Sequence, residues 1–303
     1  MTLAILVPGQ GTLHPDTLPW LESRPQAQTV LLALATAVGH DWRARLHDAE
    51  WSAINRHAQP LVTALSLAAW PCLEPALPGP AVVAGYSVGE LAAFAIAGAL
   101  DPIGAVMLAV HRAHAMDRAA AGRAMGLLAV NGLERARLAA LCERHDLAVA
   151  IRLADDHAIV GGLAAALDAA KAELAAHGAR GTRLAIRVAS HTRWMAPAAA
   201  RVAQGLVLRP PSTALVCNFT SGVVRTPPEL AHALSQQIAN PIRWDACMDT
   251  IAERGVRCVL EVGPGTTLAA LWRGRYPHIP ARSLDDFRSP DAATAWARRT
   301  LAD

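Results

Sequence analysis

The sequence G-Y-S-V-G-E at residues 85–90 places a serine where it can act as a nucleophile. A short apolar run, Ala81–Ala84, precedes this G-x-S-x-G motif, and a helix-like run, Leu91–Ala97, follows it. A sharp turn between a strand and a helix exposes a serine hydroxyl, and the flanking glycines let the two elements approach closely. The N–H after the serine then lies at a helix N-terminus, where it can stabilise an oxyanion. A turn that merely connects two elements is the alternative, but this placement favours a nucleophilic Ser87.

A serine nucleophile needs a general base, normally a histidine that a hydrogen-bond acceptor holds in one tautomer. Among the twelve histidines, His191 is distinct because it follows a strand-like run, Leu184–Val188, where the chain leaves an inserted unit. A junction between two structural units is a common place for a catalytic cleft. We find no aspartate or glutamate whose sequence context predicts the third member of a Ser-His-Asp triad. From the residues alone, His191 is favoured over the other histidines by its position, and no third member of a triad is identified.

The other histidines and the cysteines do not predict a metal site. His111 and His114 have a spacing that permits metal ligation on a helix, but no carboxylate-rich segment accompanies them. His157 follows two aspartates and is expected in a turn. The five cysteines are scattered and form no C-x-x-C pair, which argues for reduced thiols and against structural zinc. We expect the remaining histidines to be solvated: His14, His40, His47, His57, His145, His177, His232 and His278.

The composition is that of an enzyme with a sizeable core, because 53% of the 303 residues are hydrophobic and 17% are charged. A formal net charge of +3 gives no indication of nucleic-acid binding. Proline, histidine or charged residues interrupt each apolar run well before the length of a membrane span, so we expect no membrane partner. The first eight residues lack a basic region and predict a strand instead of a signal peptide. The unclustered cysteines favour a cytoplasmic setting.

Strand-like and helix-like patterns alternate along the chain, which predicts an α/β fold with a mainly parallel sheet. Within residues 124–189 the order becomes β-α-β-β-α-β, the ferredoxin-like arrangement. We therefore expect a small subdomain inserted into a large, hydrolase-like α/β domain formed by residues 1–123 and 190–303. The insertion has predicted strands at 125–130, 147–153, 158–161 and 182–188, and helices at 134–145 and 164–177. The large domain has predicted strands at 2–7, 81–84, 214–219 and 257–262, and helices at 26–38, 61–70, 91–97, 102–121, 197–206, 229–239, 244–253 and 267–273.

A series of short motifs runs in order along the whole chain. They are P-G-Q-G at residues 8–11, A-Q-P at 58–60, G-Y-S-V-G-E at 85–90, Arg112 with Met116, S-H at 190–191 with M-A-P at 195–197, Q-I-A-N-P-I-R-W at 237–244 and E-V-G-P-G at 261–265. Each motif alone is weak, but the collinear series resembles the malonyl-CoA:acyl carrier protein transacylase family over nearly the full length. The β-α-β-β-α-β insertion is also a feature of that family.

The resemblance implies that Ser87 accepts an acyl group and that His191 is its general base. In the family a main-chain carbonyl orients this base, and the matching position is Gln237. The resemblance also implies an oxyanion hole formed by the backbone N–H groups of Gln10 and Val88, the usual arrangement for acyl transfer. From the residues alone, Gln237 would be a polar residue near a helix end and P-G-Q-G a turn that ends a strand.

Arg112 resembles the residue that pairs with the free carboxylate of a malonyl group. A guanidinium holds a carboxylate by two parallel hydrogen bonds, which fits this role, although a solvated helix arginine is the alternative. The resemblance implies no bound cofactor. The substrates would be malonyl-CoA, a CoA thioester, and the prosthetic-group thiol of an acidic acyl carrier protein.

The sequence departs from the fatty-acid-synthesis members of the family at two places. Tyr86 stands where they usually have histidine, and the loop T-L-H-P after Gly11 lacks their second glutamine. These departures resemble the transacylase (epsilon) subunit of malonate decarboxylase, which would imply a dedicated carrier subunit as acceptor and other decarboxylase subunits as partners. A fatty-acid or polyketide transacylase is one alternative, and a serine esterase or thioesterase with the same elbow is another.

Overall fold

The first strand, β1 (Leu3–Val7), is buried along its whole length, and its alternate side chains enter two different cores. Leu3 and Ile5 belong to one core, while Ala4 and Leu6 belong to the other. Successive side chains of a strand point to opposite faces, so a strand that is apolar throughout must have both faces covered. The chain therefore builds a central sheet with helices on each side, as the α/β prediction requires.

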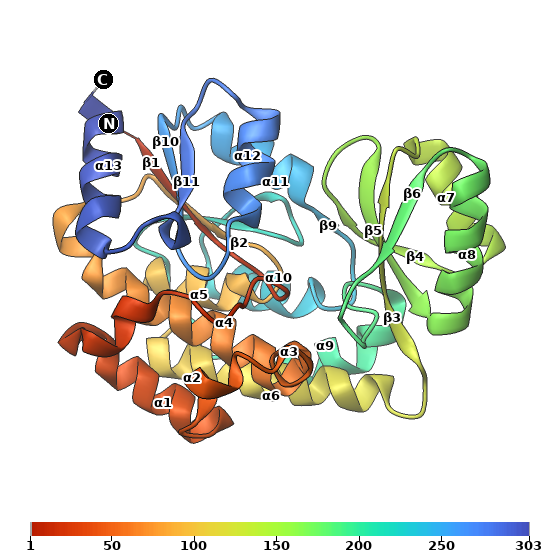
Figure 1. Ribbon diagram of the computed structural model, residues 1–303, viewed down its shortest axis with the longest axis horizontal. Helices are drawn as coiled ribbons and strands as arrows, with labels where there is room; N and C mark the ends of the chain where they lie inside the picture. Colours follow the sequence, from red (N-terminus) through yellow and green to blue (C-terminus); the bar gives the residue numbers. More distant parts are fainter. Residues whose placement is uncertain (1, 303) are drawn as a thin grey trace.

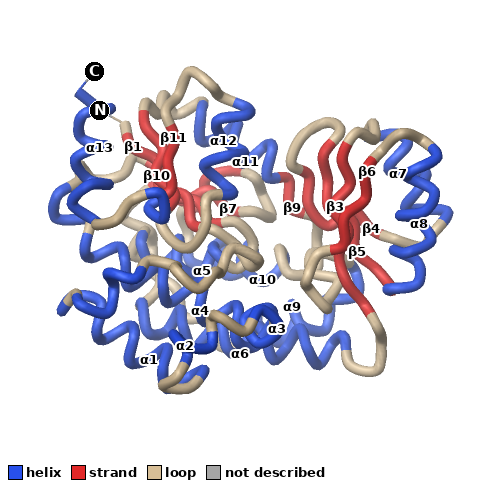
Figure 2. The backbone as a smooth tube through the Cα atoms, in the orientation of Figure 1, coloured by secondary structure: helices blue, strands red, loops and turns tan. Residues whose placement is uncertain are grey.

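The computed structural model describes residues 2–302, and β1 lies in the middle of a six-stranded sheet in the order β11-β10-β1-β2-β7-β8 (Figures 1 and 2). Neighbouring strands in this sheet are parallel except β7 and β8, which are antiparallel. The remaining strands are β2 (Val82–Gly85), β7 (Ala214–Cys217), β8 (Gly222–Val224), β10 (Cys258–Glu261) and β11 (Ala281–Ser283).

Two groups of helices cover the large sheet. The first group packs on the face of Leu3 and Ile5 and comprises α1 (Gln28–Val38), α4 (Asn55–Ala69), α5 (Gly89–Ile96), α6 (Pro102–Ala120), α10 (Pro227–Gln236) and α13 (Pro290–Ala302). The second group packs on the face of Ala4 and Leu6 and comprises α11 (Trp244–Ala252) and α12 (Thr267–Arg275). Three shorter helices are α2 (Trp42–Arg45), α3 (Ala49–Ala53) and α9 (Ala196–Val202).

The inserted unit has the ferredoxin-like fold predicted from the sequence, and it lies beside the large domain in Figure 1. Its sheet has the order β6-β3-β5-β4, with all these neighbours antiparallel and two helices on one side. The elements are β3 (Met125–Asn131), α7 (Arg135–Arg144), β4 (Ala148–Arg152), β5 (His157–Leu163), α8 (Ala164–Ala176) and β6 (Arg180–Arg183).

A fifth strand, β9 (Ile242–Arg243), extends this small sheet by pairing parallel to β4. It is contributed by a segment far along the chain from the insertion. We propose 124–189 as the subdomain, with 1–123 and 190–303 as the large domain; residues 1 and 303 lie outside the described residues.

The strand predicted at 182–188 is wrong for most of its length, because β6 ends at Arg183. The alternating pattern of Leu184, Ile186 and Val188 is instead satisfied by packing: the first two lie against the core shared with the large domain, and Val188 is buried in a smaller cluster. The sequence analysis missed β8, β9 and β11, and the helices α2, α3 and α13. The Asp101 side chain caps the N-terminus of α6, because it accepts a hydrogen bond from the Gly104 N–H at 2.8 Å.

Within residues 2–302, none of the helices combines the length and the apolar character needed to span a bilayer. All five cysteines are free thiols.

Candidate active site

The turn between β2 and α5 holds Ser87 at a backbone φ of 56°, in the left-handed region. A non-glycine residue in this conformation costs about 1–2 kcal/mol, so the surrounding contacts must impose it. The flanking glycines make the turn possible. A Cβ on Gly85 would lie 2.2 Å from the Gly89 carbonyl, and a Cβ on Gly89 would lie 2.4 Å from the Val7 carbonyl oxygen. Strand and helix thus approach too closely for a side chain at either position, as the motif predicted.

The structure brings Ser87 and His191 together across 104 positions of sequence. Ser87 Oγ lies 2.7 Å from His191 Nε2, and His191 Nδ1 lies 2.5 Å from the main-chain carbonyl oxygen of Gln237. That carbonyl can only accept, so Nδ1 carries the proton and Nε2 is left with a lone pair facing the hydroxyl. His191 is also at a positive φ, 61°, and its backbone N–H donates to the Ile238 carbonyl at 2.9 Å. The geometry is that of a hydroxyl beside a neutral base.

Burial keeps this base neutral. The His191 side chain is 1% exposed, and its desolvation, followed by the positive charge of Arg112, lowers its pKa to about 3. The hydrogen bond to the Gln237 carbonyl acts in the opposite direction but is weaker than these two effects. An imidazole with this pKa is unprotonated at neutral pH, so its Nε2 lone pair is free to take a proton, and the lowered pKa also makes it a weaker base than free histidine.

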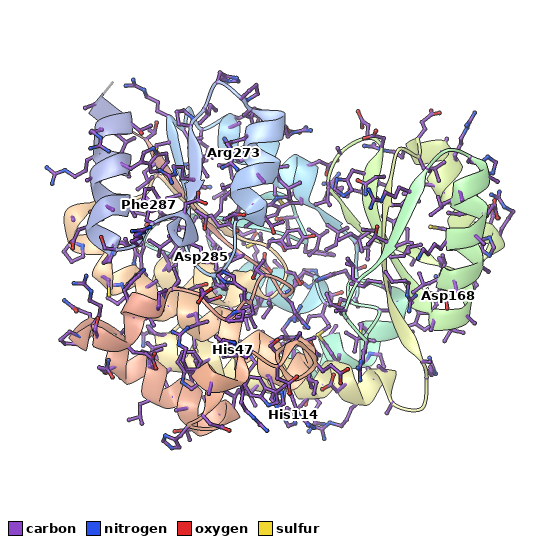
Figure 3. All side chains as sticks on the ribbon, in the orientation of Figure 1. His47, His114, Asp168, Arg273, Asp285 and Phe287 are labelled. Carbon is purple, nitrogen blue, oxygen red and sulfur yellow. The ribbon has the colours of Figure 1, made fainter. Side chains whose placement is uncertain are left out.

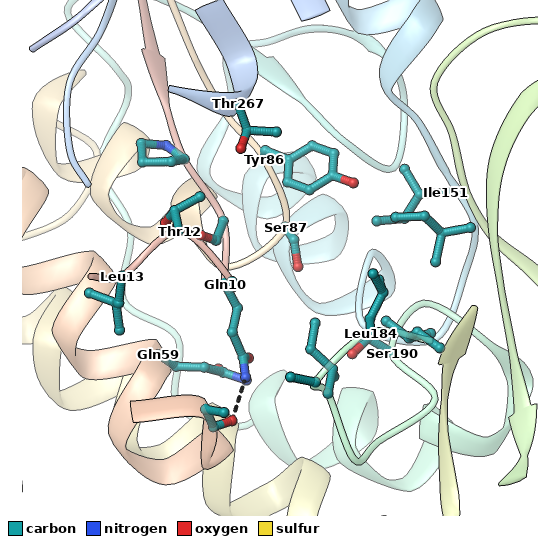
Figure 4. Close-up of a pocket in the computed structure, with 18 of the residues that line it drawn as sticks. Gln10, Thr12, Leu13, Gln59, Tyr86, Ser87, Ile151, Leu184, Ser190 and Thr267 are labelled. Carbon is teal, nitrogen blue, oxygen red and sulfur yellow. Dashed lines mark hydrogen bonds between the residues drawn. The ribbon is translucent and has the colours of Figure 1, made fainter. Parts of the chain in front are cut away.

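Ser87 opens into a cavity of about 460 Å³ between the large domain and the small subdomain (Figure 4). The large domain contributes the polar wall, which includes Gln10, Gln59, Ser87, Arg112 and His191. The small subdomain contributes a mostly apolar wall, formed by Leu127, Ile151, Leu153, His157, Ile159, Leu184, Ala185 and Ile186.

Arg112 belongs to the polar wall and is 2% exposed, so it is not the solvated helix arginine of the alternative prediction. Its Nη1 donates to Gln59 Oε1 at 2.7 Å, whereas Nε and Nη2 have no partner among the described residues. Gln59 is itself held by Asn55, whose Oδ1 accepts from Gln59 Nε2 at 2.5 Å. Burial lowers the pKa of Arg112 to about 10, with the Glu90 charge opposing the shift, so the guanidinium remains charged at neutral pH. Unpaired donors on a buried cation favour an anionic ligand in this cavity.

The residues predicted for the oxyanion hole flank the serine. Gln10 lines the cavity in the loop after β1, and Val88 directly follows Ser87 at the start of α5. Within residues 2–302, neither backbone N–H donates a hydrogen bond to another part of the protein. The Gln10 side chain is turned away to donate to the Ala53 carbonyl at 3.2 Å (Figure 4).

Two residues near the site have roles in the structure that the sequence analysis missed. His157 does not lie in a turn; it is the first residue of β5 and lines the apolar wall of the cavity. Asn218 follows β7, is fully buried, and accepts a hydrogen bond from the Ser87 backbone N–H at 2.8 Å. No motif marks Asn218, and 131 positions separate it from the serine.

The remaining histidines lie outside the cavity. His47 and His114 are exposed on the large domain (Figure 3). His145 differs from the prediction of a solvated side chain, because it is 20% exposed and contacts Glu173 at 2.7 Å. His14 contacts Asp285 at 2.5 Å and remains 43% exposed. In the described part of the chain, no group of three or more histidine, cysteine or acidic side chains is arranged to hold a metal ion.

The fold and this site define an α/β acyltransferase. Residues 25–279 match the acyl transferase domain family, and the chain belongs to that family. It is 33% identical over 292 residues to a malonyl CoA-acyl carrier protein transacylase of Mycobacterium tuberculosis, covering 93% of this chain and 96% of that one. A relative with the same name from Salmonella typhimurium is 28% identical over 302 residues, covering 96% and 98%.

Solved structures resemble this protein over nearly the whole chain. A malonyl CoA-acyl carrier protein transacylase from Coxiella burnetii superimposes with a TM-score of 0.91 at 26% identity, covering 99% of this chain and 98% of that one. A malonyl-transacylase in complex with a type II polyketide synthase acyl-carrier protein gives a TM-score of 0.90 at 26% identity, covering 97% and 99%. The chain is thus an acyltransferase enzyme with a large α/β domain and a ferredoxin-like subdomain.

Proposed function

We propose that this enzyme transfers a malonyl group from malonyl-CoA to the thiol of an acyl carrier protein through a malonyl-serine on Ser87. The observation that carries the proposal is Arg112, a buried guanidinium with two unpartnered nitrogens in the same cavity as the Ser87–His191 pair. A thioester with a free carboxylate satisfies both features at once. The names of the relatives support the same substrates.

In the first half-reaction, Ser87 Oγ attacks the thioester carbonyl as His191 Nε2 takes its proton. The Gln10 and Val88 N–H groups stabilise the resulting oxyanion, and the Gln237 carbonyl keeps the imidazolium oriented. When the tetrahedral intermediate collapses, the C–S bond breaks and the imidazolium protonates the leaving CoA thiolate. The product is free CoA and a malonyl ester on Ser87.

In the second half-reaction, the thiol of the carrier attacks the malonyl ester as His191 takes the thiol proton. The C–Oγ bond then breaks, and the imidazolium returns a proton to Ser87. Atoms and charges balance over the two steps without a cofactor. A neutral acceptor on His191 Nδ1 stabilises the imidazolium less than an aspartate would, yet it still fixes the tautomer.

Arg112 anchors the distal carboxylate of the malonyl group in this scheme. Two parallel hydrogen bonds from Nε and Nη2 would orient the acyl group, while Nη1 stays with Gln59. Orientation of the reacting carbonyl relative to Ser87 lowers the barrier as well as the substrate Kd. An esterase with the same elbow would have no need for a buried cation at this position.

For the carrier, we propose the dedicated carrier subunit of malonate decarboxylase, in a cytoplasmic enzyme that contacts other subunits of that complex. Tyr86 supports this finer proposal, because it replaces the usual histidine before the serine and its ring packs edge-on against Trp244, with 5.2 Å between ring centroids. A fatty-acid or polyketide carrier is the other candidate, in keeping with the names of the relatives.

A competition experiment tests both levels of the proposal. The enzyme is given malonyl-CoA with equal amounts of two purified carriers, a phosphopantetheine carrier of fatty acid synthesis and a malonate decarboxylase carrier with its CoA-like prosthetic group. Mass spectrometry then measures which carrier gains a malonyl group. We expect the decarboxylase carrier to be malonylated faster. Preference for the other carrier would contradict the finer proposal alone, whereas release of free malonate with neither carrier modified would support a thioesterase.

A further inference from the structure

A side-chain amide behind the cavity holds the backbone of Ser87. Asn218 Oδ1 accepts a hydrogen bond from the Ser87 N–H at 2.8 Å, and Asn218 Nδ2 donates to the Gly85 carbonyl at 2.6 Å. Asn218 is fully buried and is not among the residues that line the cavity. Any effect it has on the reaction must therefore pass through the backbone of the elbow.

These two hydrogen bonds continue the large sheet past its last paired residues. Strands β2 and β7 are parallel, and their pairing ends at Ala84 and Val216. Beyond this point the chain turns into the left-handed conformation of Ser87, and the backbone of β7 no longer supplies an acceptor. A primary amide carries the same N–H and C=O groups as a peptide. The Asn218 side chain thus takes the place of the next backbone hydrogen-bonding pair.

Asn218 is fixed from the helix side as well. Its backbone N–H donates to Glu90 Oε1 at 2.5 Å, and Glu90 is a fully buried residue in the first turn of α5. Asn218 therefore connects the strand before Ser87 with the helix after it. Rotating its amide by 180° would set an NH₂ group against the Ser87 N–H and an oxygen against the Gly85 carbonyl, so the neighbours allow one orientation.

We propose that Asn218 is a positioning residue for the nucleophile. It fixes the peptide between Tyr86 and Ser87, and this peptide sets the direction of Ser87 Oγ toward His191 Nε2. Misplacing a reacting group by 1 Å can cost about 10²-fold in rate. The inference rests on Ser87 being the nucleophile of the proposed function. If Asn218 served only the stability of the fold, its replacement would lower Tm without selectively slowing the chemistry at Ser87.

The test uses the full-length chain and a fluorophosphonate, which labels activated serines whatever acyl group the enzyme prefers. The variants are Asn218→Ala, which removes both hydrogen bonds, and Asn218→Asp, which keeps an oxygen facing the Ser87 N–H. Leu301→Ala is the matched control, because Leu301 is 1% exposed in α13, which packs against β10 and not against β2. The readouts are the labelling rate, Tm, and the kcat and KM for malonyl-CoA.

We expect Asn218→Ala to be labelled at least about tenfold more slowly than the wild type, with kcat reduced and KM changed by less than about threefold. The labelling rate of Asn218→Asp should lie between those of the wild type and Asn218→Ala. Leu301→Ala should have a lower Tm but the labelling rate of the wild type. Wild-type labelling of Asn218→Ala overturns the inference, as does an equal loss in Leu301→Ala. Should Asn218→Ala fail to fold, wild-type labelling of Asn218→Asp overturns it. Failure of the wild type to form a malonyl adduct would instead overturn the proposed function, because the fluorophosphonate still reports on Ser87.

Discussion

The two walls of the cavity differ in the interactions that position their residues. The large-domain wall has buried polar groups at fixed distances, as in the contacts of Ser87 with His191 and of Arg112 with Gln59. The wall from the small subdomain is almost entirely aliphatic, and Leu184 and Ile186 in it belong to a segment without regular secondary structure. A hydrogen-bonded group must be placed within a fraction of an ångström, whereas an apolar surface needs only to fit and exclude water. We therefore propose that one wall carries the chemistry and that the other excludes water.

Removing the nucleophile should have the largest effect. Ser87→Ala leaves no hydroxyl to carry the acyl group, so we expect transfer to fall by about 10³-fold or more and no malonyl-enzyme to form. Intact-mass measurement after mixing with malonyl-CoA, with peptide mapping, checks this. Ser52→Ala is the control, because Ser52 also lines the cavity but should retain the adduct. A malonyl group mapped to another residue would refute the assignment of Ser87.

Removing the cation should alter selectivity more than the capacity for acyl transfer. In Arg112→Ala the malonyl carboxylate loses a charge-assisted pair, so we expect kcat/KM for malonyl-CoA to drop by about 10²-fold while some acetyl transfer persists. The ratio of kcat/KM for malonyl-CoA and acetyl-CoA is the measurement. Arg118→Ala on the same helix provides the matched control, since that arginine is exposed. An unchanged ratio in Arg112→Ala would contradict the proposal that Arg112 anchors the malonyl carboxylate.

The pH dependence of kcat/KM reports how Arg112 and burial change the pKa of His191. Because the pKa of His191 is lowered to about 3, the base is deprotonated across the neutral range, and kcat/KM of the wild type should not decline on acidification from about pH 7 to pH 5. Loss of the neighbouring positive charge raises the pKa of His191, so the acid limb of Arg112→Ala should lie at higher pH than that of the wild type. A wild-type acid limb near the ordinary histidine pKa would show that His191 is less desolvated than the structure indicates.

A substitution in the apolar wall should have the smallest effect on the reaction. It should change hydrolysis of the malonyl-serine instead of acylation. Leu184→Ala opens the wall without touching a reacting group, so we expect acylation to be nearly unchanged and hydrolysis of the malonyl-serine to rise about threefold relative to transfer. The ratio of free malonate to malonyl-carrier measures this. Leu163→Ala is the control, because Leu163 is 42% exposed on the same subdomain. A loss of acylation as large as that in Arg112→Ala would break the division between the walls.

Sequence patterns predicted the helices and strands whose apolar residues recur with a clear period, and the site residues that lie in motifs. The ferredoxin-like order, the helix beginning at Pro102 and the strand-turn-helix around Ser87 all follow from local signals. Gln59 was part of a matching motif, yet its bond to Arg112 could not be deduced, because it depends on how α4 and α6 pack. Asn218 carried no signal at all, since its importance comes only from lying at the end of the strand next to β2.

The wrong and missed predictions concern segments whose structure depends on tertiary contacts. Residues 184–188 alternate as a strand does, but after the hydrogen bond from the Leu184 N–H to the Leu127 carbonyl the segment leaves the sheet, and its apolar side chains pack in cores. Strand β9 has two residues, too few for any period to be visible, and its partner β4 lies about ninety positions earlier. Elements defined by tertiary contacts alone leave no pattern in the chain that forms them.

Strand β9 also bears on whether the small subdomain is a separable module. A gene fragment encoding residues 124–189 would contain every strand of the small sheet except this one, leaving the outer edge of β4 unpaired. Unprotected sheet edges recruit other chains, so the excised fragment would tend to self-associate. The same strand follows Gln237 by only five positions, which ties the small sheet to the carbonyl that orients His191. Exchanging this subdomain between relatives would therefore require residues 237–243 to move with it.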